Sequence, residues 1–222
     1  MDNRILDALA SCPLFEDMTV PDIETAATNA GYKLVQLYRG DLCGLAGDKL
    51  NHLDIVLSGE MTARMTGASG RMVEIKRWQR GGMITPGFIF AADNTLPVTL
   101  EAAGKVQLLR FSAKALSCMI AVNEQVRLNY TRRLSDIVAF LTEKLRFLAL
   151  LTVREKVACA LISEARTQQS RTITLNRSRQ TIADSFGIQK FSLMRCLADF
   201  VAKGAIRVDG RTITILNSDK MK

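Results

Sequence analysis

The longest uninterrupted helical pattern covers residues 124–151, which contain neither proline nor glycine. Apolar side chains recur there about once per helical turn. Such a helix extends about 42 Å at ~1.5 Å per residue, which is more than the neighbouring sequence can cover. We expect the same helix of a second chain to cover this face as a coiled-coil homodimer, although a helix lying on its own domain is the alternative. The expected interface residues are Val126, Tyr130, Leu134, Ile137, Leu141 and Leu145.

The sequence before this helix changes from helical to strand periodicity. Residues 19–31 predict a helix capped by Thr19, with Asp22 reaching back and Gly31 ending it. In residues 32–111, short alternating runs are separated by glycine turns, including one at 66–70. Leu53, Ile55 and Leu57 are expected on one face of a strand, with Asp54, Val56 and Ser58 on the other. This pattern predicts a small antiparallel roll, barrel or sandwich, and Ser112 then caps a short helix.

The sequence after the long helix predicts a winged helix-turn-helix. A short helix around Ile182 and Phe186 is followed by Gly187, and a longer helix starts near Gln189. Residues 206–215 predict a hairpin that turns at Asp209-Gly210, with Ile206 opposite Ile213.

The net charge of +8 is unevenly distributed. Residues 152–222 hold 13 Lys and Arg against 6 Asp and Glu, while residues 1–151 hold 17 against 16. A basic small domain beside a neutral larger one is typical of nucleic-acid binders.

The remaining composition indicates a cytoplasmic protein without a membrane span or signal peptide. The five cysteines form no CxxC pair, so neither a disulfide framework nor a metal site is indicated. The only histidine is His52, and there is no nucleotide-binding or metalloprotease motif. We therefore expect no enzymatic activity.

The predicted second helix of the helix-turn-helix has an apolar face and a polar face. Arg195 is placed to bind guanine O6 and N7, and Lys190 to reach a base or a phosphate. Donors at the start of the preceding helix, together with Arg207 and Arg211 on the hairpin, suit phosphate. The candidate DNA-binding residues are Ser178, Arg179, Gln180, Gln189, Lys190, Phe191, Ser192, Arg195 and Arg211.

The chain resembles the cyclic-AMP-receptor and fumarate–nitrate-reductase (CRP/FNR) regulators over almost its whole length. The resemblance rests on residues 13–15, 19–23, 39–41, 53–59, 178–184 and 186–187. It implies an α+β fold with a cyclic-nucleotide-binding-like β-roll over 1–122, a dimerisation helix over 123–151 and a winged helix-turn-helix over 152–222. It also implies a homodimer on a palindromic promoter site, with half-sites one helical turn apart, and RNA polymerase as a partner.

The sequence departs from the cyclic-AMP-binding members of the family. Phe88 stands where they have a glutamate, and residues 96–98 stand where they have the phosphate-binding arginine. A buried cyclic phosphate without its cation costs several kcal/mol, so we expect no cyclic-AMP binding. An apolar effector pocket is expected instead, at Gly87, Phe88, Ile89, Leu96, Pro97 and Val98.

The cofactor, if any, is not determined by the sequence. Only Cys12 and Cys43 lie in the N-terminal part, which disfavours an iron–sulfur cluster. A haem held by a cysteine and His52 is left open, because residues 88–98 and 134–148 resemble regulators of nitrosative-stress genes from anaerobes, some proposed to use haem.

The recognition helix also departs from the family. Phe191 replaces the glutamate that accepts a hydrogen bond from cytosine, so the operator is expected to differ at one base pair per half-site. The predicted function is transcription regulation by an effector or redox signal at the roll. The alternative is a sensor that acts through protein or RNA contacts.

Overall fold

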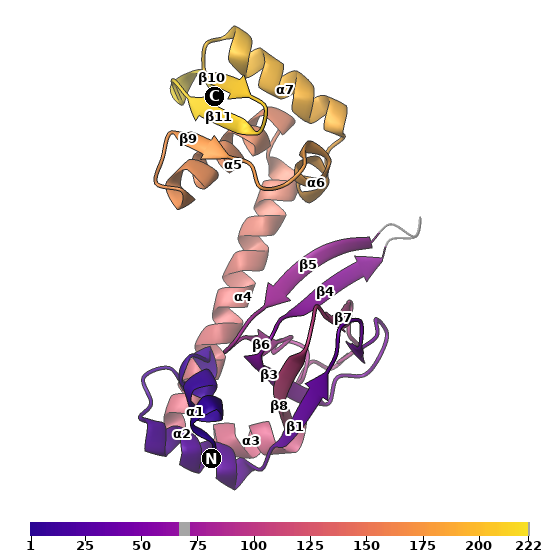
Figure 1. The fold of residues 1–222 in the computed structure, drawn as a ribbon, viewed down its shortest axis with the longest axis vertical. Coiled ribbons are helices and arrows are strands. Elements are labelled where there is room, and N and C mark those ends of the chain that lie inside the picture. Colours follow the sequence, from indigo (N-terminus) through magenta and orange to yellow (C-terminus); the bar gives the residue numbers. More distant parts are fainter. Residues whose placement is uncertain (67–71, 222) are drawn as a thin grey trace. The chain divides into compact units, whose positions relative to one another are not determined.

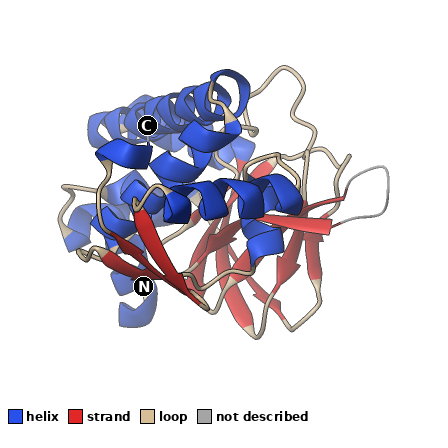
Figure 2. Ribbon diagram, turned by 90° about the horizontal axis from the view of Figure 1, so that it is seen from above, coloured by secondary structure: helices blue, strands red, loops and turns tan. Residues whose placement is uncertain are grey.

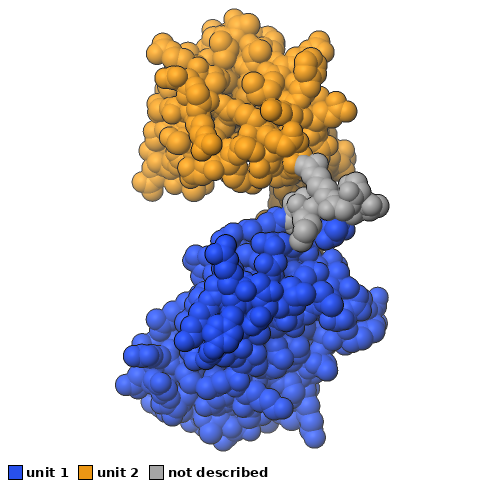
Figure 3. All heavy atoms as spheres, turned by 45° about the vertical axis from the view of Figure 1, so that its right-hand side comes forward, with its two compact units in different colours: residues 1–138 blue, residues 139–222 orange. Residues whose placement is uncertain are grey.

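The computed structural model describes residues 1–66 and 72–221, so most of the turn expected at 66–70 lies outside the described residues. The chain divides into two compact units, residues 1–138 and 139–222 (Figure 3). The long helix α4 (Glu124–Leu150) begins in the first unit and ends in the second. The division expected from the sequence placed this helix in a segment of its own, at residues 123–151.

Unit 1 contains two four-stranded antiparallel sheets, drawn in Figure 1. The first has the order β1-β8-β3-β6, from β1 (Lys33–Leu37), β8 (Val106–Ser112), β3 (His52–Ser58) and β6 (Met83–Ile84). The second has the order β2-β7-β4-β5, from β2 (Leu42–Gly44), β7 (Thr99–Ala102), β4 (Met61–Thr66) and β5 (Met72–Trp78). The expected β-roll is confirmed.

Helices gather at one end of unit 1, away from the β4–β5 ribbon (Figure 1). They are α1 (Asn3–Ala10), the 3₁₀ turn η1 (Pro13–Phe15), α2 (Val20–Ala30) and α3 (Ala113–Val122). The predicted caps are confirmed, because Thr19 Oγ1 accepts from Asp22 N and Ser112 Oγ accepts from Ala115 N. Each cap satisfies a backbone donor that the first helical turn leaves without a partner.

Strand β3 is buried on both faces, which the alternation of its residues did not indicate. Asp54 is only 2% exposed and Val56 is fully buried, as are Leu53 and Ile55. Helices α1 and α3 pack on β3, while the Asp54 side chain reaches Cys43 on the other sheet. The charged Asp54 is therefore buried because a strand of the second sheet lies beside it.

Unit 2 contains α5 (Val153–Thr167), α6 (Arg179–Ser185) and α7 (Lys190–Ala202), followed by a short η2 turn (Asp219–Met221). A three-stranded antiparallel sheet has the order β10-β11-β9, from β10 (Ile206–Asp209), β11 (Thr212–Ile215) and β9 (Thr172–Thr174). Helices and strands are distinguished by colour in Figure 2. The winged helix-turn-helix is confirmed, and β9 is an additional strand.

The register of the hairpin differs from the prediction. Ile206 pairs with Ile215 and Val208 with Ile213, while Asp209 pairs with Thr212. The two turn residues are therefore Gly210 and Arg211, and Gly210 supplies the positive φ of 54° that the tight turn requires.

The apolar face of α4 is buried near the start of the helix and exposed farther along it. Val126 is fully buried and Tyr130 is 6% exposed, both in the core of unit 1, and the Tyr130 hydroxyl donates to the Pro86 carbonyl at 2.7 Å. These two residues were expected at a dimer interface, and the structure corrects this because their own roll covers them. Leu141 and Leu145, by contrast, are 56% and 67% exposed. Among the described residues, no helix is both long and apolar enough to cross a membrane.

Candidate nucleic-acid interface

The helix-turn-helix is held together by a small apolar core in unit 2. Ile182 and Phe186 from α6 and the following turn are buried with Leu193 and Leu197 of α7. Gly187 occupies the turn with φ +64°, a conformation that side-chain-bearing residues rarely adopt. The Phe186 ring also packs edge-on against Phe147, with ring centroids 5.4 Å apart. These contacts hold α6 and α7 against one another around the turn.

Helix α7 has one buried and one exposed face. Leu193, Cys196, Leu197 and Phe200 face the core. The predicted base-reading residues lie on the other side: Gln189, Lys190, Phe191 and Arg195 are exposed, and Ser192 is half-buried. The Phe191 side chain is large and apolar, yet it is 75% exposed and does not belong to the core of the unit. The structure thus brings these five predicted residues to one surface.

Three cations lie exposed on this surface and on the wing. Within the part of the chain that the structure describes, Lys190, Arg195 and Arg211 take part in no ion pair or side-chain hydrogen bond, and all three are exposed. Cations left in water are available to an external anion at little desolvation cost. The surface therefore suits the phosphates and base edges of a duplex.

The three predicted residues at the start of α6 already have intramolecular partners. Ser178 is the N-cap, because its Oγ accepts from Thr181 N at 3.1 Å. Gln180 Nε2 donates to Asp184 Oδ1 at 2.8 Å. Arg179 Nη2 donates to the Gly210 carbonyl at 3.1 Å, and burial lowers the pKa of Arg179 below its ordinary value. Arg179 thus joins α6 to the turn of the wing, a role that the sequence did not indicate.

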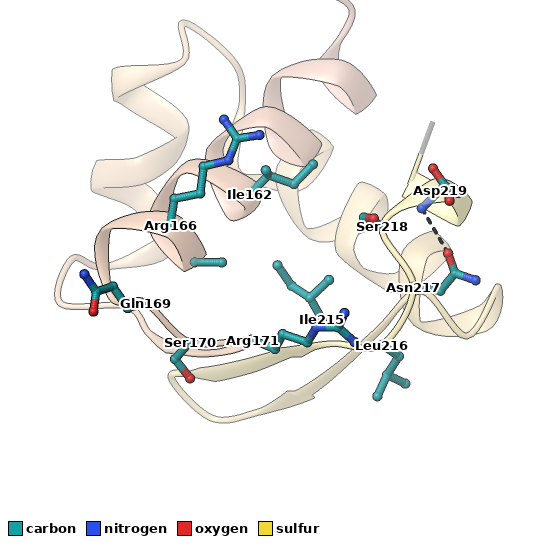
Figure 4. A pocket seen from close by; sticks show the side chains of 11 residues that line it. Ile162, Arg166, Gln169, Ser170, Arg171, Ile215, Leu216, Asn217, Ser218 and Asp219 are labelled. Atoms are coloured by element: carbon teal, nitrogen blue, oxygen red, sulfur yellow. Dashed lines mark hydrogen bonds between the residues drawn. The ribbon is translucent and has the colours of Figure 1, made fainter.

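A cavity of about 510 Å³ lies elsewhere in unit 2 (Figure 4). Its lining includes Ile162 and Arg166 from α5, Arg171 before β9, and Ile215 at the end of β11. None of the nine predicted DNA-binding residues lines it. This cavity is therefore separate from the exposed face of α7.

The predicted effector residues lie in unit 1, in the segment after β6. Ile89, Leu96 and Val98 are buried in the core, Phe88 packs against it, and Gly87 and Pro97 are exposed. A cavity of about 450 Å³ in unit 1 is lined by residues of α2 and α3 and contains none of the six. Their role as an effector pocket stays a prediction.

A polar cluster that the sequence did not reveal lies inside the roll. Arg110 on β8 is the cross-strand partner of Asp54 on β3, and its Nε and Nη2 each donate to the carboxylate at 2.7 Å. Cys43 on β2 donates from Sγ to Asp54 Oδ2 at 3.2 Å, and His52 Nε2 lies 3.4 Å from the same oxygen. Residues from three strands thus meet at one carboxylate.

The electrostatics of the cluster follow from burial and pairing. Burial alone would raise the pKa of Asp54, but hydrogen bonds from Arg110 and His52 hold it below the ordinary value. Burial, together with the neighbouring carboxylate, raises the pKa of the Cys43 thiol to about 12. At neutral pH the cluster therefore holds a carboxylate, a guanidinium and a protonated thiol.

A haem does not fit between Cys43 and His52. A porphyrin needs a flat apolar cleft, whereas charged Asp54 and Arg110 contact or border both donor atoms.

The roll, the winged helix-turn-helix and the exposed cationic face of α7 define a DNA-binding transcription regulator. Residues 155–222 match the family model described as the Crp-like helix-turn-helix domain. This match assigns residues 155–222 to the Crp-like helix-turn-helix domain.

Solved structures share the fold at low sequence identity. CooA from Carboxydothermus hydrogenoformans is 16% identical with a TM-score of 0.64, covering 100% of this chain and 95% of that one. The catabolite activator protein of Thermus thermophilus is 17% identical with a TM-score of 0.59, covering 94% and 96%. FixK2 from Bradyrhizobium japonicum is 16% identical with a TM-score of 0.57, covering 86% and 96%. No curated protein sequence matches the chain significantly.

Proposed function

We propose that the protein is a homodimeric, sequence-specific transcription regulator that binds a two-fold symmetric promoter site and responds to a signal at the β-roll. The observation that carries this proposal is the exposed face of α7. Lys190 and Arg195 are exposed there and take part in no ion pair or side-chain hydrogen bond within the described residues, while the opposite face of the same helix is buried. RNA polymerase is the expected protein partner at such a promoter.

The exposed face of α7 also supports a particular kind of base readout. Arg195, one turn into the helix, is placed to bind guanine O6 and N7. Phe191 cannot accept a hydrogen bond from a base, but its exposed ring can contact a thymine methyl group. We therefore expect an operator with a guanine read by Arg195 and a thymine beside it in each half-site.

Selection of binding sites from random duplex DNA tests this proposal. The expected result is a palindrome with half-sites about one helical turn apart. Arg195→Ala is expected to weaken binding by about 1–3 kcal/mol and to relax the preference at one base pair per half-site. Binding without sequence preference would instead favour a sensor that acts through protein or RNA contacts.

The homodimer is supported by the exposed apolar side chains of α4. Val138, Leu141, Leu145 and Leu148 are between 40% and 67% exposed, and half-buried Leu134 precedes them. These five residues alternate at intervals of four and three, which is the 3.5-residue repeat of a left-handed coiled coil. The proposed seam therefore uses Leu134, Leu141 and Leu145 from the sequence-based prediction and adds Val138 and Leu148.

We further propose that the signal is not cyclic AMP. Residues 87–98 contain no Lys, Arg or His, and the one carboxylate in this segment, Asp93, pairs with Lys49 at 2.8 Å. The buried apolar side chains of Ile89, Leu96 and Val98 offer no counter-charge to a cyclic phosphate. Calorimetric titration with cyclic AMP is expected to give no stoichiometric heat, and tight binding would refute this part of the proposal.

A signal at the roll would act by favouring one of two arrangements of the dimer. A few kcal/mol of differential binding between two such arrangements is enough to shift the population.

A further inference from the structure

We propose that Phe147 is a positioning residue for DNA recognition, because it fastens the helix-turn-helix to the end of α4. Its ring packs edge-on against Phe186, the residue that ends α6, with ring centroids 5.4 Å apart and planes at 66°. Phe147 is half-buried against the core of unit 2 and is not one of the five proposed seam residues. The inference rests on the proposed function, since it concerns a dimer on a two-fold symmetric site.

Two lysines strengthen the junction between α4 and the helix-turn-helix. Lys144 Nζ lies 5.6 Å from the centroid of the Phe147 ring and donates to the Ser185 carbonyl of α6 at 3.4 Å. Lys156 of α5 is 8% exposed, and its Nζ donates to the Leu148 carbonyl at 2.9 Å. This bond satisfies one of the last four carbonyls of α4, which have no partner within the helix, and the ammonium suits the negative end of the helix dipole. The end of α4 is therefore tied to both α5 and α6.

Leu148 belongs to the junction and to the proposed dimer seam. Its Cδ2 lies 3.8 Å from the point where a Cβ on Gly187 would stand, so it contacts the turn of the helix-turn-helix. The same side chain is 40% exposed, which leaves part of it for the seam. Leu141, Leu145 and Leu148 all lie in the compact unit 139–222 that contains the helix-turn-helix. A dimer that forms along these residues therefore also sets how far each turn lies from the two-fold axis.

The distance between the two α7 helices of the dimer then depends on the Phe147 contact. Adding one base pair between half-sites moves them apart by about 3.4 Å and rotates one against the other by roughly 35°. A firm junction cannot follow this change, whereas a loose junction can. We therefore infer that Phe147 determines the preference for one half-site spacing, while the exposed residues of α7 determine the preference for bases.

Gel shifts with full-length Phe147→Ala test this inference on three kinds of duplex. These are the operator selected by the parent, the same operator with one base pair added or removed between half-sites, and a duplex with a single half-site. The parent should prefer the selected spacing by at least about tenfold, because both half-sites must be bound at once. In Phe147→Ala this preference should fall to about twofold or less, with single-half-site affinity within about twofold of the parent. Unchanged affinity for a single half-site shows that unit 2 is folded.

Three further variants separate positioning from a general effect on α4. Phe140→Ala removes the same kind of side chain two turns earlier, where it is 66% exposed, and should keep the spacing preference of the parent. Phe147→Tyr retains the ring and should keep it too. Lys156→Met retains the aliphatic stem but loses the bond to the Leu148 carbonyl, so the preference should fall by about threefold.

The outcomes distinguish this inference from the proposed function. A parent protein without preference for any palindrome would overturn both. A Phe147→Ala variant that binds a single half-site normally and keeps the spacing preference of the parent would overturn the positioning role alone. If Phe147→Ala no longer binds a single half-site, the milder Lys156→Met decides, and an unchanged spacing preference in that variant would overturn the positioning role.

Discussion

The buried charges of unit 1 and the exposed charges on the α7 and wing surface of unit 2 differ in their pairing. In unit 1, Arg110 is paired with buried Asp54, and Arg64 is paired with Glu101. On the α7 and wing surface of unit 2, Lys190, Arg195 and Arg211 have no such partners within the described residues. Unit 2 does form pairs elsewhere, since Arg154 binds Asp199. The charges buried in unit 1 are therefore paired internally, whereas those on the α7 and wing surface remain available to an external anion.

Arg110→Ala should have the largest effect on this comparison. It leaves the 2% exposed Asp54 carboxylate without its cation, so we expect the free energy of unfolding of unit 1 to fall by about 3 kcal/mol. Urea denaturation followed by Trp78 fluorescence measures this loss. Arg195→Ala is the matched control and should stay within about 0.5 kcal/mol of the parent. An equal loss of unfolding free energy in the two variants would contradict this difference between paired and unpaired charges.

Leu145→Glu extends the comparison to apolar side chains. It places a charge in the proposed seam of α4, so the dissociation constant of the dimer should rise about a hundredfold, or about 2.7 kcal/mol. Sedimentation velocity over a range of concentrations measures the shift. Phe140→Glu changes an equally exposed residue of the same helix outside the seam and should leave the dimer intact. A dimer unaffected by Leu145→Glu would rule out this seam.

Ser178→Ala should have a smaller effect, and it separates a structural role from a DNA-binding one. Loss of the cap on Thr181 N should destabilise α6 by about 1 kcal/mol. Hydrogen exchange of the α6 amides without DNA measures this change. Ser192→Ala, which removes no cap, should leave the exchange of these amides unchanged. Unaltered α6 exchange in Ser178→Ala would contradict the capping role.

Arg211→Ala should have the smallest effect on the fold. The side chain is exposed and takes part in no ion pair or side-chain hydrogen bond within the described part of the chain, so the free energy of unfolding should change by less than about 0.5 kcal/mol. If Arg211 binds a phosphate, the slope of log affinity against log salt should fall by about one for all DNA sequences alike. Gel shifts over a salt series measure the slope. Arg179→Ala should lower the slope similarly but should also loosen the wing, because it loses the bond to Gly210.

Local sequence signals predicted unit 2 well, because its elements depend on neighbours in the chain. Gly187, the spacing of Ile182 and Phe186, and the apolar face of α7 are sufficient to identify the helix-turn-helix. The hairpin register was predicted incorrectly, because Asp209-Gly210 and Gly210-Arg211 are both plausible turns. In the structure β11 pairs with β9, and Ile206 pairs with Ile215, so the turn residues are Gly210 and Arg211.

The sequence by itself determined the order of the elements, the amphipathic faces of the DNA-binding helices and the uneven charge, since periodicity, turn residues and composition act over short distances along the chain. Only the tertiary structure decided that β3 is covered on both faces, that Val126 and Tyr130 belong to their own roll, and that Cys43, His52, Asp54 and Arg110 meet. Those contacts join residues up to 67 positions apart, and nothing in the local pattern specifies which layers pack together.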